Sequence, residues 1–320
     1  MKIRVQLFLT MAFASLAHAG PTQALPEFPS RQGAKTQPNA QVHGSADTID
    51  LSAHRGDKSY YRENTISAFR SALASSASSI EFDVHLTADE VPVIYHDYSL
   101  NPKDFEGLEK PVLIKELTFK QLMSYRYRTD KPLLAGDDRV ATLAQYLQEA
   151  AAKPSAQKKI LHVEIKSEAA VLHESAPPDR LVMKTLEALQ ENPVLNKIVV
   201  RSFNWDVIEI LRMNRPEIER ILLVDRGDLA KIDIEEAVRR YQPSQVSPNF
   251  QDVTKEIVNS WKAHGIGLSP WTVNDPKVAR TLIEMGVVGF ATDQPHLMAS
   301  EISRSKIGFG RAACYGAFTK

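Results

Sequence analysis

Four short motifs carry side chains suited to the hydrolysis of a phosphate diester. His54 and His96 could transfer protons, because histidine titrates near neutral pH. Glu81 and Asp83 could hold a hard cation through their oxygens, and Arg55 could bind phosphate with its planar guanidinium. These side chains occur in the order His54-Arg55-Gly56, Glu63-Asn64-Thr65, Glu81-Phe82-Asp83 and His96-Asp97.

The acidic side chains share one face of a predicted strand. Successive side chains of a strand point to opposite faces, so Glu81 and Asp83 face away from their apolar neighbours. In a barrel of parallel strands the apolar face packs beneath the helices, and the acids should therefore point inward. The same alternation over residues 160–165 and just beyond turns His162, Glu164 and Lys166 inward. Three carboxylates should then meet in one interior.

A cluster of three buried carboxylates requires positive charge. Desolvation and mutual repulsion both disfavour the ionised forms unless a cation compensates them. Oxygen ligands of this kind suit Ca²⁺ or Mg²⁺ better than a soft metal. The alternative is an internal salt-bridge network with Arg55 and Lys166, and the alternation pattern alone favours neither.

Alternating strand and helix patterns after residue 48 predict an α/β fold with a parallel sheet. Eight such units favour a closed (β/α)₈ TIM barrel. An open doubly wound sheet is the alternative, but such folds usually place a glycine-rich phosphate loop after the first strand, and this chain has none there. The predicted strands are Ile49–Ala53, Ser79–Val84, Ile160–Ile165, Ile198–Ser202, Arg220–Val224, Gln245–Ser247, Gly267–Trp271 and Val288–Ala291. The predicted helices include Thr65–Ser75, Thr142–Ala152, Leu181–Gln190, Trp205–Met213, Ile234–Tyr241, Thr254–Ala263 and Pro276–Met285.

One long segment interrupts this alternation after the second strand region. Residues 97–140 are polar and broken by prolines and glycines, and they greatly exceed the usual connection of about 4–6 residues. We interpret the segment as an insertion over the barrel mouth; a surface insertion without a role is equally compatible with the pattern. The predicted single domain covers residues 48–300 and includes this insertion, and residues 301–320 form a C-terminal tail.

The N-terminus has the pattern of a secretory signal peptide. Lys2 and Arg4 precede an apolar run, and Ala17-His18-Ala19 is typical of a cleavage site, so we expect residues 1–19 to be removed. The run is shorter than the roughly 20 residues that span a bilayer, and no later segment could serve as a transmembrane segment. Residues 20–47 are rich in Pro, Gln, Ser, Gly and Ala and predict a flexible lead-in. The mature protein should be periplasmic or secreted.

Composition excludes several classes of partner. Lys plus Arg equals Asp plus Glu at 39 each, so no overall field would attract nucleic acid or an anionic membrane. Cys314 is the only cysteine, which rules out an intrachain disulfide. Oligomeric state is not predicted by any pattern in the chain.

Together the ordered motifs resemble the glycerophosphodiester phosphodiesterase family. The family pattern of His-Arg-Gly, Glu-Asn-Thr, Ile-Glu-x-Asp-Val, His-Asp and Glu-x-Lys is completed here by Ile80 to Val84, by His96-Asp97 and by Glu164-Ile165-Lys166, and the resemblance spans roughly Ile49 to Met298. It implies a TIM barrel that hydrolyses glycerophosphodiesters to glycerol 3-phosphate and an alcohol. It also implies one divalent cation, Ca²⁺ or Mg²⁺, held by Glu81, Asp83 and Glu164.

The resemblance also implies the roles of the two histidines, and the chemistry and placement of the other candidates predict theirs. His54 and His96 would act as general acid and base in an order that the sequence does not fix. Arg55 and Lys166 would bind phosphate and neutralise transition-state charge. Glu63 would orient Arg55 or touch the metal, although an acid in the first turn of a helix is an equal alternative. Phe203 and Trp271 stand at the C-terminal ends of predicted strands, where they could line the pocket for glycerol or the alcohol; packing in the core is the alternative. Three histidines are weaker candidates: His85 as a neighbour of the site, His162 a layer deeper, and His264.

Some positions depart from the family pattern. Arg62 stands where proline is common before Glu-Asn-Thr, Ser75 to Ser79 replaces a Gly-Ala-Asp segment, and Asn101-Pro102 replaces an Arg-Thr pair. They concern substrate preference rather than the proposed ligands or proton carriers. The segment from Ala291 to Pro295 resembles the family's last strand, and we expect a structural role for it.

Two rival functions stay open. One is a lipid-acting barrel phospholipase of phospholipase D or phosphoinositide phospholipase C type, which an apolar rim on the insertion would favour. The apolar residues of the insertion that leave this open are Leu100, Phe105, Leu108, Val112, Leu113 and Ile114. The other is a secreted binding protein that keeps the barrel without turnover.

Overall fold

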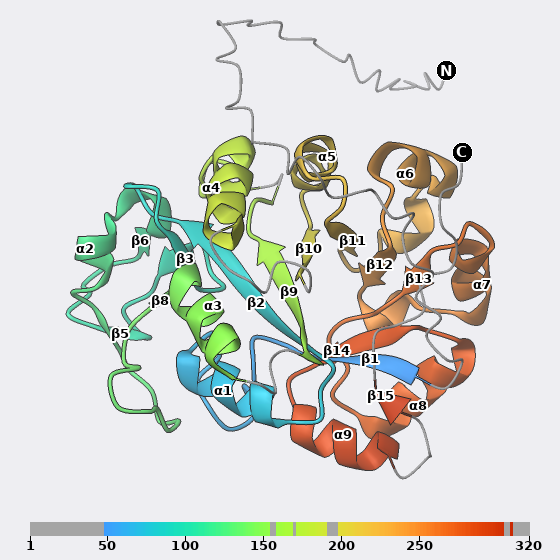
Figure 1. The fold of residues 1–320 in the computed structure, drawn as a ribbon, viewed down its shortest axis with the longest axis horizontal. Helices are drawn as coiled ribbons and strands as arrows, with labels where there is room; N and C mark the ends of the chain where they lie inside the picture. Colours follow the sequence, from blue (N-terminus) through green and yellow to red (C-terminus); the bar gives the residue numbers. More distant parts are fainter. Residues whose placement is uncertain (1–47, 154–157, 169–170, 191–197, 304–307, 310–320) are drawn as a thin grey trace, which may run out of the picture. The chain divides into compact units, whose positions relative to one another are not determined.

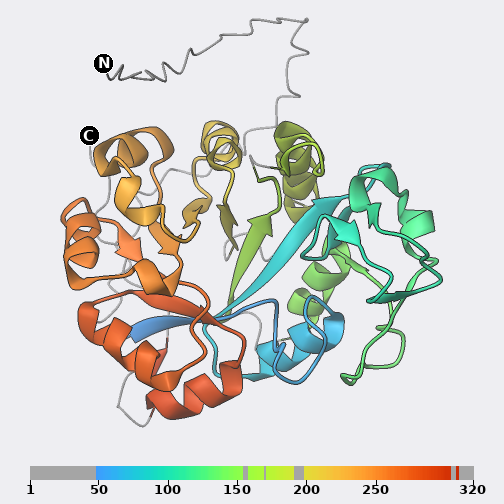
Figure 2. The same cartoon turned by 180° about the vertical axis from the view of Figure 1, so that it is seen from behind.

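Eight parallel strands surround a common interior in the computed structural model, which describes residues 48–153, 158–168, 171–190, 198–303 and 308–309 (Figures 1 and 2). Their hydrogen-bonded order is β13-β12-β11-β10-β9-β2-β1-β14. Backbone hydrogen bonds from Val288 to Leu268 and from Ala291 to Pro270 then join β14 to the β13 segment and close the ring. The predicted (β/α)₈ barrel is therefore confirmed. The strands are β1 Thr48–Ala53, β2 Ser79–Leu86, β9 Ile160–Ile165, β10 Ile198–Ser202, β11 Glu219–Val224, β12 Gln245–Pro248, β13 Gly267–Leu268 and β14 Gly289–Thr292.

The helices lie outside the ring of strands (Figure 1). Several begin directly after a side chain that caps their first turn, as when Thr65 accepts a hydrogen bond from the Ala68 N–H. Thr142, Asn204, Thr254 and Asp275 cap later helices in the same way. The helices are α1 Ile66–Ala74, α3 Leu143–Ala152, α4 Pro178–Gln190, α5 Trp205–Asn214, α6 Ile234–Tyr241, α7 Lys255–Ala263, α8 Pro276–Met285 and α9 Pro295–Ser303.

The main hydrophobic core lies between strands and helices. Phe82 on β2 packs against Phe69 of α1 and Tyr146 of α3, with ring centroids 6.0 and 5.1 Å away. Burying each such side chain contributes about 1.5–3 kcal/mol to folding. Since the apolar residues of β2 and β9 belong to this core, their polar neighbours face the interior, as the alternation predicts.

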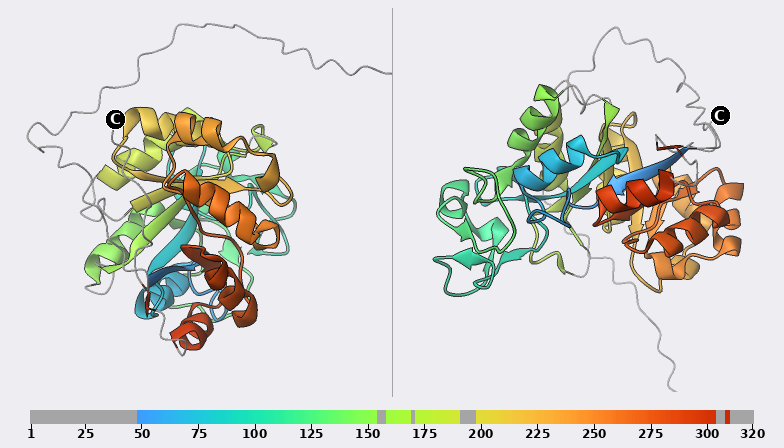
Figure 3. Two further views of the ribbon diagram at one scale, coloured as in Figure 1. Left: turned by 90° about the vertical axis from the view of Figure 1, so that its right-hand side faces the viewer. Right: turned by 90° about the horizontal axis from the view of Figure 1, so that it is seen from below.

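The insertion has a hydrophobic core of its own. It contains β4 Ser99–Leu100, β5 Phe105–Glu106, β6 Val112–Leu113, α2 Phe119–Leu122 and β7 Arg126–Tyr127, and lies between β3 Pro92–Ile94 and β8 Ala141–Thr142 (Figure 3). Leu100, Phe105, Leu108 and Ile114 are buried in this second core, and Val112 packs against it. Leu113 is half-buried and is not part of this core, so the other five residues are the ones that cannot form an apolar rim.

Asp137 attaches the insertion to the barrel. Its carboxylate accepts hydrogen bonds from the backbone N–H groups of Ile66, at 3.1 Å, and Ser67, at 2.6 Å, and from the Ser67 hydroxyl. The Leu134 N–H donates to the Ser67 hydroxyl at 2.8 Å. The insertion is thus fixed to the first turn of α1. The negative charge of Asp137 also interacts favourably with the helix dipole there.

Some predicted boundaries differ from the structure. Helix α9 continues to Ser303, past the predicted start of the tail at residue 301, and β15 Gly308–Phe309 pairs with β1 in parallel. The strand predicted for residues 267–271 is shorter in the structure. β13 ends at Leu268, and Trp271 makes only an isolated bridge to Asn249. The signal peptide, the lead-in and Cys314 lie outside the described residues. Among the described residues, no helix combines the length and apolarity needed to cross a membrane.

Replacing Asp137 should loosen the insertion. Asp137→Ala leaves buried donors on Ile66 and Ser67 without their acceptor, and each such loss costs about 1–3 kcal/mol. We expect urea unfolding to show a free energy of unfolding lower by about 2 kcal/mol. Glu109→Ala, an exposed acid on the same insertion, is the control and should change it little. Equal stability of Asp137→Ala and wild type would show that this attachment is not important.

Candidate active site

The three predicted metal ligands meet inside the barrel. One oxygen each from Glu81, Asp83 and Glu164 lies within 4.8 Å of the others, and all three residues are buried. Neighbouring strands bring them together, because Asp83 of β2 pairs in register with Glu164 of β9. The alternation of side chains therefore predicts this cluster correctly.

Glu81 has an oxygen that no protein donor satisfies. Its Oε2 accepts a 2.8 Å hydrogen bond from the Arg55 backbone N–H, while its buried Oε1 has no partner among the described residues. Burial, then the charges of Asp83 and Glu164, raises the pKa of Glu81 well above its ordinary value. An oxygen without a partner among hard carboxylate ligands fits a divalent cation.

Positive groups hold Asp83 ionised. The Asn64 side-chain amide donates to Asp83 Oδ2 at 2.7 Å, and Arg55 Nε lies 3.5 Å from the same oxygen. Burial alone would raise the pKa of Asp83, but the charges of His96, Arg55 and Lys166 bring it below its ordinary value. Asn64 was expected only as part of a motif, and the structure gives it a direct contact with a candidate ligand.

Lys166 also contacts the carboxylate cluster. Its Nζ is 3.0 Å from Glu164, 3.3 Å from Glu168 and 4.0 Å from Asp83. Although burial opposes the charged form, these carboxylates raise the pKa of Lys166 above its ordinary value. The salt-bridge network predicted as an alternative is thus present, yet it leaves Glu81 Oε1 unsatisfied. The contacts of Lys166 are therefore compatible with a bound cation, and they do not replace one.

A tight turn after β1 positions Arg55. Arg55 has φ 56° and Gly56 has φ 80°, both in the left-handed region. A Cβ at Gly56 would lie 2.8 Å from the Ala68 carbonyl carbon, so α1 approaches too closely for any other residue. This turn directs the Arg55 N–H to Glu81 and the guanidinium to Asp83.

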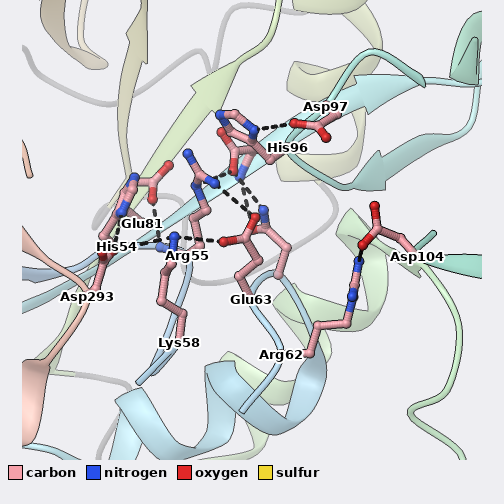
Figure 4. A network of polar contacts seen from close by, with 12 residues as sticks. His54, Arg55, Lys58, Arg62, Glu63, Glu81, His96, Asp97, Asp104 and Asp293 are labelled. Atoms are coloured by element: carbon pink, nitrogen blue, oxygen red, sulfur yellow. Dashed lines mark hydrogen bonds and ion pairs between the residues drawn. The ribbon is translucent and has the colours of Figure 1, made fainter. Parts of the chain in front are cut away.

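Glu63 orients two cations. It accepts a 2.8 Å hydrogen bond from Arg55 NH1 and lies 2.8 Å from Lys58 Nζ (Figure 4). Helix α1 begins only at Ile66, so the alternative of a first-turn acid is wrong. Glu63 is also outside the three-carboxylate group, and its observed contacts are with Arg55 and Lys58.

His54 is held by a residue that sequence reasoning assigned only a structural role. Its Nδ1 lies 2.6 Å from Asp293 Oδ1, and the Asn274 amide donates to Asp293 Oδ2 at 2.8 Å. Burial lowers the pKa of His54, and Asp293 partly opposes this. Lys58 Nζ is 3.6 Å from Asp293. The position of Asp293 directly after the last barrel strand, next to β1, was the available signal.

His96 is the more accessible of the two histidines. About 32% of its side chain is exposed, and its Nδ1 is 2.7 Å from Asp97 Oδ1. His85 faces inward from β2 and its Nε2 contacts the His96 carbonyl at 3.1 Å, with a pKa lowered to about 4 by burial. His85 therefore supports the backbone at His96, as a neighbour of the site.

The other candidates take distinct places. Phe203 and Trp271 form an edge-to-face pair with centroids 5.5 Å apart, and Lys166 Nζ lies 6.0 Å from the Phe203 ring. His162 lies deeper in the interior, 3.6 Å from Asp50. His264 hydrogen-bonds the Ser260 carbonyl of its own helix and is not part of the site.

Comparison with known proteins gives a consistent result. The model of the glycerophosphoryl diester phosphodiesterase family matches residues 54–297. The chain is 28% identical to a glycerophosphodiester phosphodiesterase of Caldanaerobacter subterraneus subsp. tengcongensis over 79% of this chain and 97% of that protein. A crystal structure of a glycerophosphodiester phosphodiesterase from Parabacteroides distasonis has a TM-score of 0.64 at 25% identity, covering 82% of this chain and 100% of that one. A crystal structure from Silicibacter pomeroyi has a TM-score of 0.74 at 25% identity, covering 83% of this chain and 96% of that one. The chain belongs to the glycerophosphoryl diester phosphodiesterase family of hydrolases.

Proposed function

We propose that the protein is an exported, metal-dependent phosphodiesterase that hydrolyses glycerophosphodiesters to glycerol 3-phosphate and an alcohol. The observation that carries the proposal is the convergence of two histidines and three carboxylates at one end of the barrel. Small soluble diesters are the expected substrates, because the family and its relatives carry that activity in their names. The signal-peptide pattern of residues 1–19 supports export.

The carboxylates of Glu81, Asp83 and Glu164 would hold the cation. Hard oxygen ligands fit Ca²⁺ or Mg²⁺, and the unsatisfied Glu81 Oε1 supports occupancy. A bound divalent cation would supply positive charge against the phosphate oxygens. Arg55 and Lys166 would add fixed positive charge to the same region, which favours the more negative transition state.

We assign the base to His54 and the acid to His96. In this assignment Nδ1 of His54 carries a proton and donates a hydrogen bond to the Asp293 carboxylate. Nε2 is then free to take a proton from water or a substrate hydroxyl. As the new P–O bond forms, the old P–O bond breaks and His96 donates a proton to the departing oxygen. The buried, lowered-pKa His54 suits the first role, and the accessible His96 suits the second.

The lipid-phospholipase alternative loses its main support in the insertion. Of the six apolar residues that could have formed a membrane-facing rim, four are buried in the second core, Val112 packs against it, and Leu113 is half-buried. A binding protein without turnover would not need the His54–Asp293 contact, in which a carboxylate orients a side chain that can transfer protons.

Product analysis tests the proposed reaction. Glycerophosphocholine or glycerophosphoethanolamine should release glycerol 3-phosphate without detergent micelles. Exhaustive chelation should abolish turnover, and Ca²⁺ or Mg²⁺ should restore it, because the three acids then regain their cation. Full turnover of a metal-free preparation would contradict the metal assignment. Cleavage of acylated substrates alone would favour the phospholipase.

Variants of the two histidines and of Asp293 test the proton transfers. His54→Ala and His96→Ala should each lower kcat by at least about 10²-fold, the usual scale for a positioned acid or base. Asp293→Asn removes an interaction that raises the pKa of His54, so the ascending limb of the rate–pH profile should move to lower pH while kcat falls.

The matched control is His264→Ala, because His264 contacts only its own helix in the described structure. Its kcat should equal that of wild type. Circular dichroism and unfolding curves would confirm that every variant folds. Near-normal turnover of His54→Ala or His96→Ala would remove that histidine from the mechanism.

A further inference from the structure

A charged cavity of about 300 Å³ adjoins His96. It lies between the turn after β1 and the insertion, and every lining side chain carries a charge, a hydroxyl or an imidazole. A cavity of this size is at the lower end of small-ligand sites. It is lined by His96, the histidine to which the proposed mechanism gives the role of acid.

Most of the charges in this cavity are already paired. Lys58 contacts Glu63 at 2.8 Å, Arg62 lies 3.7 Å from Asp104, and His96 contacts Asp97. These pairs use their charges on each other. They leave little net charge for a ligand.

Three further lining charges form no ion pair within 4.0 Å among the described residues, although the charge of Lys103 contributes to lowering the pKa of Asp97. Lys131 Nζ donates to the Lys58 backbone carbonyl, which does not neutralise it. No ion pair joins Lys103 Nζ or the Asp130 carboxylate to another group among the described residues. The cavity therefore offers two ammonium groups and one carboxylate to a ligand.

The walls are held in place before a ligand enters. The Arg62 guanidinium lies 4.4 Å from the Tyr127 ring centroid and 5.9 Å from that of Phe105, and NH1 donates to the Arg128 carbonyl at 3.4 Å. The Arg128 N–H in turn donates to the Asp104 carbonyl at 2.7 Å. Arg62, which replaces the family's usual proline, thus joins the turn after β1 to the strands of the insertion (Figure 4).

We propose that this cavity binds the alcohol half of the substrate and favours a head group of the amino-acid type, with one carboxylate and one ammonium. Two lysines and one aspartate are the charge complement of such a group: Lys103 and Lys131 face the carboxylate, and Asp130 faces the ammonium. The inference rests on the proposed glycerophosphodiester activity and adds the head-group class, of which glycerophosphoserine is the simplest member.

The other flank of the phosphate site suits the glycerol half. Lys166 Nζ lies over the Phe203 ring, Phe203 packs edge to face with Trp271, and the two rings offer apolar contact to a carbon chain. A charged head group would lose its hydration against these rings without a partner, whereas the cavity supplies opposite charges. His96 borders the cavity, so the alcohol released there is the one whose oxygen it protonates.

Competing substrates test the proposal on the full mature enzyme. We expect kcat/KM for glycerophosphoserine to exceed that for the uncharged glycerophosphoglycerol by about tenfold, the scale of a few accessible charge pairs. The double variant Lys103→Met/Lys131→Met should remove this preference, mainly through KM for the serine diester. Asp130→Asn should lower kcat/KM for the serine and ethanolamine diesters relative to the glycerol diester. High salt should reduce the preference as well.

Lys110→Met is the control, because Lys110 is exposed on the same insertion and does not line the cavity. It should keep the wild-type ratio. Equal kcat/KM for all three diesters, or an unchanged ratio in the double lysine variant, would overturn the head-group proposal and leave the proposed phosphodiesterase activity intact. Absence of hydrolysis of every diester, with metal present, would overturn both.

Discussion

The site depends on the burial of three carboxylates on one inner face of the barrel. Glu81, Asp83 and Glu164 come from adjacent strands, and their repulsion would destabilise the fold without nearby positive charge. Arg55 and Lys166 supply part of that charge through the turn after β1 and the end of β9. Glu81 Oε1 is the oxygen of this cluster for which the described residues provide no hydrogen-bond donor. The cluster could therefore hold a divalent cation inside the barrel.

The same arrangement connects the carboxylate cluster to His54. Arg55 contacts Asp83 and is oriented by Glu63, which also contacts Lys58. Lys58 approaches Asp293, the partner of His54. One connected set of charges therefore runs from the carboxylate cluster to His54, and a change at any member alters the field at the others.

Much of the site follows from the sequence because strand alternation is a local property. The inward direction of Glu81, Asp83 and Glu164 needs only the apolar residues between them, and the structure agrees. Asp293 could not be assigned in this way. Its contact with His54 exists only because the last strand closes against the first, and closure depends on pairing across the whole chain. The structure of the insertion could not be predicted either. Its apolar residues are compatible with a second core or with an exposed rim until their neighbours are known.

The most direct test of this account is anomalous diffraction from crystals of the mature protein soaked with Mn²⁺ or Ca²⁺. The account predicts one strong peak inside the barrel, bordered by the carboxylates of Glu81, Asp83 and Glu164, which disappears in Glu81→Gln crystals. A catalytically active protein with no peak at these carboxylates, or with its ion held elsewhere, would contradict the claim on which the site depends.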